Sequence, residues 1–179
     1  MNQFQSIREG YEQIGHEQYY QEYGSNYKNP HEDKIKQALL MGLAKWKPKL
    51  IKVLDLACGS GEITLILKSL GVKNIVAIDP YTMEAFKKRT GEECLPISFE
   101  QIADGQIGDH EYSLIICSYA MHLADDSLLP GLCMQLAMIS KHMIILSPHK
   151  RPVIKWGWNQ VDEIIKDKTH ARFYTSTYL

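Results

Sequence analysis

Residues 51–64 read IKVLDLACGSGEIT, an apolar run that ends near an acid and leads into a loop with two glycines. An apolar run of this kind is typical of a buried β-strand, and the glycine turn after it leads into a helix. Gly59 and Gly61 let the backbone approach a ligand closely, and free amides mark the start of the helix. The stretch therefore predicts a ligand that lies against bare backbone at the end of a strand.

Segments of strand and helix character alternate along the chain, which is typical of a parallel sheet with helices on its faces. Helices are expected over residues 6–23, 29–46, 62–70, 82–89, 127–140 and 158–168. In the second of these, Asn29 is expected to be the cap and Pro30 to take the first helical position. Strands are expected over residues 52–56, 74–78, 94–98, 113–117, 143–146 and 171–178. We therefore predict an α/β fold with a doubly wound, mostly parallel sheet of six to seven strands and helices on both faces.

Length and composition indicate an ordinary globular protein. The 179 residues are 45% apolar and 23% charged, with a net charge of −1, and we expect one domain over 1–179 with residues 1–46 as an N-terminal helical cap segment. No apolar stretch approaches the ~18–20 residues of a spanning helix, and the start lacks a signal-peptide apolar block. We therefore expect a cytoplasmic protein without membrane contact. Its four cysteines lie far apart, which predicts neither a metal site nor a disulfide framework.

Charge is unevenly distributed along the chain. Between Met1 and Asp33, six acids face two bases, whereas from Lys141 to the end seven bases face three acids. One interpretation is that these are the solvated faces of a nearly neutral protein. The other is that the basic end meets an anionic substrate or partner.

The chemistry of the expected ligand follows from two acids. Ligands of doubly wound sheets bind at the carboxyl ends of the strands, and Asp79 ends the second expected strand, 20 residues beyond Gly59. An acid at this distance is the usual partner of a ribose diol. The dinucleotide pattern is incomplete, because Thr64 stands where its third glycine would be, and the carboxylate of Asp55 would repel a pyrophosphate. These residues favour a nucleoside that carries positive charge and no phosphates.

The motifs resemble those of the class I S-adenosylmethionine-dependent methyltransferases. VLDLACGSGEIT is similar to the first motif of that family, IVAIDP to the second, and PISFEQIADG to the adenine-binding stretch after the third strand. The resemblance covers roughly residues 51–147, and the family often carries an acid where Ser98 stands. It implies S-adenosylmethionine as the cofactor, with contacts from Asp55, Ala57, Gly59, Gly61, Asp79, Pro80, Ser98, Phe99, Ser118 and Tyr27. In this fold the N-terminal segment often closes over the cofactor, so Tyr20, Tyr23 or Tyr27 is expected to cover its methyl group.

The acceptor side is predicted from residues that follow the later strands. ICSYAMHLADD brings Ser118, Tyr119 and His122 to the cofactor's edge, and ILSPHKRP brings His149, Lys150 and Arg151 to the same rim. A histidine can take the proton that an oxygen or nitrogen acceptor must lose, so His122 and then His149 are the catalytic candidates. Substrate contacts are expected from Tyr119, Lys150 and Arg151. Each histidine could instead simply pack, and each base could simply be solvated.

Three functions agree with these features. The first is transfer of a methyl group to an oxygen or nitrogen of a small-molecule acceptor. The second is RNA methylation, with RNA bound by the basic C-terminal residues Lys150, Arg151, Lys155, Lys166, Lys168 and Arg172. The third is a non-catalytic subunit that binds S-adenosylmethionine and serves as a partner scaffold.

Overall fold

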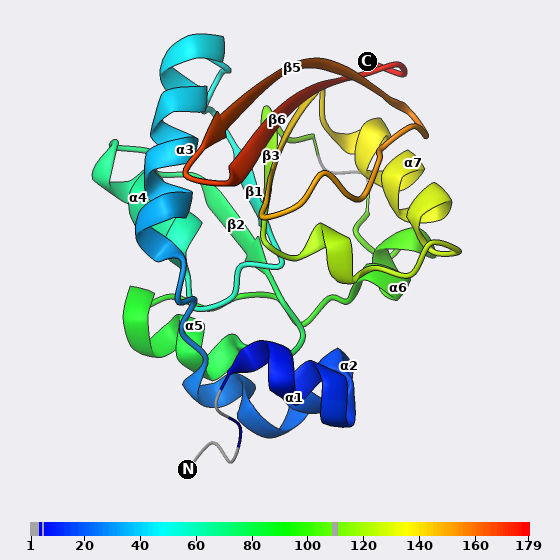
Figure 1. Cartoon of the computed structure of the whole chain (residues 1–179). Helices are drawn as coiled ribbons and strands as arrows, with labels where there is room; N and C mark the ends of the chain where they lie inside the picture. The colour runs from blue at the N-terminus through cyan, green and yellow to red at the C-terminus, as the bar shows by residue number, and fades with distance from the viewer. Residues whose placement is uncertain (1–3, 5, 109–110) are drawn as a thin grey trace.

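The computed structural model describes residues 4, 6–108 and 111–179 (Figure 1). Residues 1–3 and 5 of the expected cap segment lie outside this range. The strands are β1 (Val53–Leu56), β2 (Ile75–Ile78), β3 (Leu114–Ser118), β4 (His142–Ser147), β5 (Trp158–Lys166) and β6 (Thr169–Ser176). The helices are α1 (Ile7–Ile14), α2 (His16–Tyr23), α3 (Glu32–Trp46), α4 (Glu62–Ser69), α5 (Met83–Thr90), α6 (Phe99–Ala103) and α7 (Leu129–Ile139), with short 3-10 turns η1 (Gly24–Asn26) and η2 (Met121–Leu123).

The described strands form one sheet in the order β2-β1-β3-β4-β6-β5. Strands β1 to β4 pair in parallel, β6 runs antiparallel to β4, and β5 runs antiparallel to β6. The six-stranded, mostly parallel sheet is thus confirmed. From β1 the chain first goes outward to β2 and then returns to β3 on the other side, so the strand order reverses there. Ligands of such sheets bind at this reversal, beyond the carboxyl ends of β1 and β3.

Alternate residues of the parallel strands face two different helical layers. One face packs against α3 and α4, through Val53, Leu114 and Ile144 with Ile35, Leu39 and Leu67. The other packs against α6 and α7, through Leu54, Ile115 and Ile145 with Ile102, Leu132 and Leu136. Because both faces are covered, these strands are apolar apart from Asp55 in β1 and polar residues at strand ends, and they do not alternate.

The N-terminal segment expected as one helix over residues 6–23 is a pair of helices. Gly15 separates α1 from α2 and has a φ of 81°, a left-handed value that few other residues adopt. Tyr11 and Tyr19 pack edge to face between the two helices, with ring centroids 5.4 Å apart. In Figure 1 the pair lies at the end of the molecule opposite the β5–β6 hairpin.

Residues 158–168 were expected as a helix, and this prediction is wrong. They form β5 and the turn into β6. Trp158, Val161 and Ile165 recur at helical spacing. In the structure the ladder skips Val161, because a bulge shifts the register there, and the two-residue alternation of a strand is broken. Because the bulge interrupts the alternation, the apolar residues of this strand have the spacing that predicts a helix.

The strand expected over residues 94–98 is also absent from the described structure. This segment meets β2 through the Leu95–Ile78 bridge and then leads into α6. Pro96 follows directly and has no N–H to extend a ladder. The sheet still has six strands, because β5, which was expected to be a helix, adds a strand at the edge opposite β2.

The expected cap of α3 differs as well. The helix begins at Glu32, with His31 at the N-cap position and no hydrogen bond from its side chain. Asn29 instead accepts a hydrogen bond from the His31 backbone N–H at 2.9 Å through its Oδ1 atom. Its side chain thus turns the chain just before the helix, a local role common for asparagine.

The C-terminal hairpin is fixed to the body of the molecule by tryptophans. Trp46, at the end of α3, donates from Nε1 to Asp162 at 2.8 Å and stacks on Phe173 with ring centroids 5.1 Å apart. Trp158 donates from Nε1 to the carbonyl oxygen of Cys133 in α7 at 2.9 Å. Both sides of the hairpin are therefore anchored by indoles that are also hydrogen-bonded.

We expect the ion pair between β5 and β6 to stabilise this hairpin. Arg172 is 4% exposed and donates from Nε to Glu163 at 2.8 Å, directly across the ladder. Glu163→Ala leaves the buried guanidinium without its carboxylate, so the free energy of unfolding should fall by about 3 kcal/mol, the low end for a broken buried pair. Denaturant titration measures this. The matched control, Glu93→Ala, removes an exposed pair with Lys87 and should change stability little; an equal effect of both variants would contradict the prediction.

Candidate active site

The carboxylate of Asp55 ties the end of β1 to the start of α4. Its Oδ2 atom accepts from the Thr64 backbone N–H at 3.0 Å and from the Thr64 hydroxyl at 2.6 Å. The loop between them turns through Ala57, Gly59 and Gly61, whose φ angles are 55°, 55° and 91°. Thr64, at the position of the missing third glycine, is therefore the partner that holds Asp55.

The glycine loop is also held from β2. Asp79 accepts through Oδ2 from the Gly59 N–H at 3.2 Å, and through Oδ1 from the N–H groups of Tyr81 and Thr82 at 2.8 and 3.0 Å. The Thr82 hydroxyl donates to the Gly59 carbonyl oxygen at 2.8 Å. A carboxylate has about four acceptor positions, so Asp79 can still accept one further hydrogen bond.

A third buried acid, Glu62, supports the loop and was not singled out from the sequence. It is 5% exposed, and its Oε1 atom accepts from the Ser60 hydroxyl at 2.5 Å and from Arg89 Nη1 at 3.1 Å. Arg89 also donates to Glu32 of α3 at 2.8 Å. The guanidinium therefore links α3, α4 and α5 behind the loop. A glutamate in a first helical turn gave no signal beyond its favourable interaction with the helix dipole.

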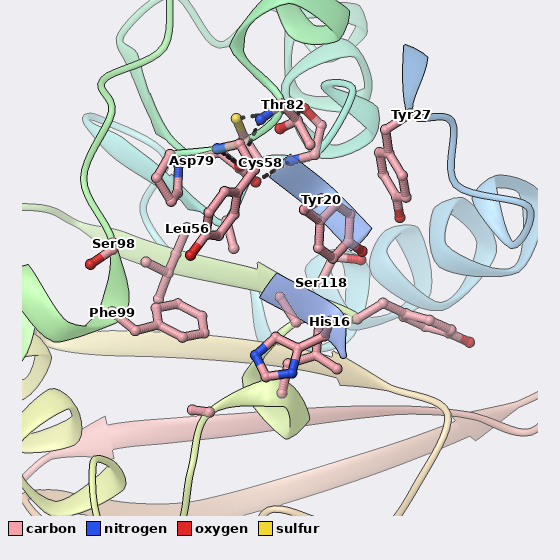
Figure 2. Close-up of a pocket in the computed structure, with 18 of the residues that line it drawn as sticks. His16, Tyr20, Tyr27, Leu56, Cys58, Asp79, Thr82, Ser98, Phe99 and Ser118 are labelled. Atoms are coloured by element: carbon pink, nitrogen blue, oxygen red, sulfur yellow. Dashed lines mark hydrogen bonds between the residues drawn. The ribbon is translucent and has the colours of Figure 1, made fainter. Parts of the chain in front are cut away.

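One cavity lies in front of this loop, at the carboxyl ends of β1, β2 and β3 (Figure 2). Nine of the ten predicted cofactor residues line it: Tyr27, Asp55, Ala57, Gly59, Asp79, Pro80, Ser98, Phe99 and Ser118. The tenth, Gly61, sits behind the loop, where an added Cβ would lie 3.2 Å from Phe86. The lining residues that sequence reasoning missed include His16, Glu17, Asn29, Cys58, Glu62, Tyr81, Glu100 and Asp125.

Two acids that line the cavity, Asp55 and Asp79, have raised pKa values. Burial raises the pKa of Asp55 to about 7, and the nearby carboxylates of Glu62 and Asp79 add to the rise, while the Thr64 hydrogen bonds oppose it. Burial also raises the pKa of Asp79, against the lowering effect of its N–H donors. Asp55 Oδ1 is buried and has no hydrogen-bond partner in the described protein. Such an atom calls for a ligand that donates a hydrogen bond or carries positive charge.

Two serines line the cavity in different states. Ser98 caps α6: its hydroxyl accepts from the Gln101 N–H at 3.3 Å, and its own N–H donates to the Gln101 side chain at 2.9 Å. Its side chain is therefore already used at the place where related sequences often carry an acid. Ser118, the last residue of β3, has a buried Oγ atom with no partner among the described residues. That hydroxyl is free to bind a ligand.

Comparison with known proteins agrees with this geometry. Residues 53–142 match the family described as methyltransferase domain. An uncharacterized protein of Schizosaccharomyces pombe is 30% identical over an alignment of 231 residues that covers 97% of this chain and 93% of the relative. The chain belongs to the class I S-adenosylmethionine-dependent methyltransferases.

Solved structures show the same fold for this methyltransferase. The N-methyltransferase NodS from Bradyrhizobium japonicum, in complex with S-adenosyl-L-homocysteine, superposes with a TM-score of 0.66 at 14% identity, covering 89% of this chain and 97% of that one. The magnesium protoporphyrin IX methyltransferase from Synechocystis, with bound SAM, gives 0.61 at 14% identity, covering 99% and 100%. At such low identities the likeness is one of fold.

The two histidines predicted for catalysis lie together, outside the residues that line the cavity of the methyltransferase. The rings of His122 and His149 pack edge to face with centroids 5.7 Å apart. Burial lowers the pKa of His122 to about 4, well below that of a solvated histidine, with further lowering from His149 and from His16. The structure thus brings these histidines together, and their catalytic role stays a prediction.

The predicted substrate residues are spread over different environments. Tyr119 lines the cavity, although its hydroxyl is bonded to that of Thr169 at 2.8 Å. Lys150 and Arg151 are exposed and do not belong to the lining. Arg172, expected to contact RNA in the alternative function, is buried against Glu163 and donates to the His149 carbonyl oxygen, so that expectation is wrong.

Tyrosines of the N-terminal segment form one wall of the cavity. Tyr20 and Tyr27 line it, with ring centroids 5.4 Å apart, and Tyr20 stacks on Tyr81 at 6.1 Å and 18°. Tyr23, considered with them as a cover, packs instead against Phe4 and Tyr19. The segment therefore closes one side of the cavity through α2 and the residues just after it.

Two features of the described residues bear on membrane and metal partners. No helix in the described part of the chain is long and apolar enough to cross a membrane. Among the described residues, no group of three or more His, Cys, Asp or Glu side chains is arranged to hold a metal ion.

Proposed function

We propose that the cavity binds S-adenosylmethionine and that residues 1–179 act as one methyltransferase domain, with residues 1–46 as its cap. The observation that carries this is the buried, unpartnered Oδ1 of Asp55, a residue that lines the cavity beside the glycine loop. The cationic, nucleoside-containing cofactor supplies what this atom lacks. When bound, S-adenosylmethionine provides an electrophilic methyl group on sulfur.

Each part of the lining has a role in this proposal. Asp55 attracts the positive part of the cofactor, and Asp79 accepts the ribose hydroxyl hydrogen bond for which it has one position left. Ala57, Gly59 and Pro80 bring backbone close to the ligand. Ser98 and Phe99 hold the adenine, while the free hydroxyl of Ser118 and the ring of Tyr27 border the reacting end.

The proposed acceptor is a small molecule methylated on oxygen or nitrogen. The cavity is bordered on one side by the N-terminal segment and on the other by α6, so an acceptor must enter a confined space. Two proteins of the same fold, NodS and the magnesium protoporphyrin IX methyltransferase, have names that specify an N-methyltransferase and a porphyrin substrate. In the alternative with RNA, Arg172 is unavailable and Lys166 is near Asp167, which weakens the expected basic surface.

His122 is proposed to take the proton from the acceptor, with His149 packed against it. Because its pKa is about 4, it is uncharged at neutral pH and able to accept a proton. The same low pKa makes it a weaker base than a solvated histidine. Lys150 and Arg151 are proposed to contact the substrate from outside the lining.

Cofactor binding is tested by Asp79→Ala. Calorimetry with S-adenosylmethionine should show saturable binding to the wild type and a loss of at least ~1 kcal/mol in the variant, since a hydrogen bond to a charged group is removed. Glu84→Ala, an exposed acid on α5, is the control and should bind normally. Melting curves of each variant separate loss of binding from unfolding. Absence of binding by the folded wild type would refute the proposal.

The raised pKa of Asp55 predicts a pH dependence of affinity. Only the ionised carboxylate attracts a cation, and in the free protein it ionises near pH 7. Affinity for S-adenosylmethionine should therefore level off above pH 7 and fall by up to about tenfold per unit below it, until the pKa of the bound form is reached. Calorimetry from about pH 5.5 to about pH 8.5, a range that brackets this pKa, measures the affinity. Asp55→Asn should bind more weakly and flatten the profile; an unchanged profile would remove Asp55 from cation binding.

Proton removal is tested by His122→Ala. Turnover should fall by about 10²-fold while the dissociation constant of S-adenosylmethionine stays nearly constant, the pattern of a group that acts in the transfer step. Because the pKa of His122 is about 4, its protonation should inhibit the wild type only well below pH 6. His149→Ala is measured in parallel. Unchanged turnover of His122→Ala would show that another group takes the proton.

A further inference from the structure

The titratable side chains that line the cavity are almost entirely acidic. They include Glu17 from α2, Glu100 from α6 and Asp125 after η2, in addition to the acids near the glycine loop. Among the described lining residues there is no lysine or arginine, and His16 is the one histidine. A carboxylate or phosphate on an acceptor would be repelled at this opening, because like charges at short range disfavour each other.

The outer acids are separate from those beside the glycine loop. Glu17, Glu100 and Asp125 are exposed, whereas Asp55 is 1% exposed at the end of β1. Asp55 lines the same cavity, and its buried, unpartnered Oδ1 independently calls for positive charge. If the cofactor's cation lies at Asp55, the exposed carboxylates remain available to a second cationic group at the mouth.

Aromatic rings complete the surroundings of such a group. Tyr20 and Tyr81 are stacked with ring centroids 6.1 Å apart, and Tyr27 lies edge-on to Tyr20. All three rings line the cavity. Faces of aromatic rings attract cations, and rings together with carboxylates are the usual recognition of ammonium groups.

We infer that the methyl acceptor is a small amine, which enters the cavity as an ammonium ion between Tyr20, Tyr81 and the carboxylates of Glu17, Glu100 and Asp125. This inference rests on the proposed function and narrows its acceptor to nitrogen. The ammonium group first loses a proton to His122, the base proposed above. The nitrogen lone pair then forms the N–CH₃ bond as the S–CH₃ bond breaks, and the electron pair of that bond stays on sulfur, which becomes a neutral thioether.

Binding of a cation that cannot be methylated tests the inference without relying on turnover. Phenyltrimethylammonium is titrated into the protein saturated with S-adenosylhomocysteine, so that the nucleoside part of the cavity is filled. Saturable binding is expected, with affinity that falls as salt is raised. The variant Glu17→Gln/Glu100→Gln/Asp125→Asn should bind it about tenfold more weakly, whereas Glu84→Gln should bind as the wild type. Phenylpropanoate, an anion of similar size, should bind poorly to the wild type.

The acceptor itself is then sought by incubating the protein with methyl-labelled S-adenosylmethionine and a small-molecule extract. Label is expected in a new product, resolved from the cationic S-adenosylmethionine itself, that is retained on a cation exchanger at neutral pH. Failure of phenyltrimethylammonium to bind, equal binding of phenylpropanoate, or label found in anions or RNA would each overturn the inference. Direct calorimetry with S-adenosylhomocysteine distinguishes the two levels: if it does not bind, the proposed function fails as well, and if it binds, only the choice of an amine is lost.

Discussion

The hydrogen bonds from Thr64 to the buried carboxylate of Asp55 are the constraint on which the site depends. They fix the end of β1 against the first turn of α4, and so determine the path of the glycine loop between them. Asp79 then holds the same loop from β2. Because both acids use part of their acceptor capacity on the protein, the loop is formed before any ligand arrives. Preorganisation of this kind lowers the entropy lost on binding.

The same arrangement gathers negative charge in a place with little water. Asp55, Glu62 and Asp79 are each less than a tenth exposed, and Arg89 compensates Glu62 alone among them. Burial and mutual repulsion keep protons on Asp55 at pH values where a solvated aspartate is ionised. A cationic ligand relieves both effects, so the free protein carries an electrostatic cost that binding reduces. The buried acids therefore lower the stability of the free protein and raise its affinity for a cationic ligand.

The fold and the cofactor side could be predicted from the sequence because they depend on local patterns. Apolar runs identified β1 to β4, and the spacing of Asp55, Gly59 and Asp79 identified the loop and its ligand class. The sequence failed where long-range contacts decide. A bulge at Val161 concealed β5, and Glu17 and Glu100 reach the cavity only because α2 and α6 pack around it. Equally, the burial that lowers the pKa of His122 arises from packing that no motif records.

Half of the tyrosines lie at one end of the molecule, whereas two tryptophans lie at the other, and this gives the molecule two optical signals. Five of its ten tyrosines lie within residues 1–46, and two of those border the cavity, whereas Trp46 and Trp158 anchor the hairpin at the other end of the molecule. Tryptophan emission therefore follows the integrity of the sheet's antiparallel edge. The near-ultraviolet dichroism of tyrosine contains the five N-terminal tyrosines together with Tyr81, Tyr112, Tyr119, Tyr174 and Tyr178, so a change in the N-terminal wall alters part of this signal. A loosening of α2 over the cavity would change the second signal and leave the first almost untouched.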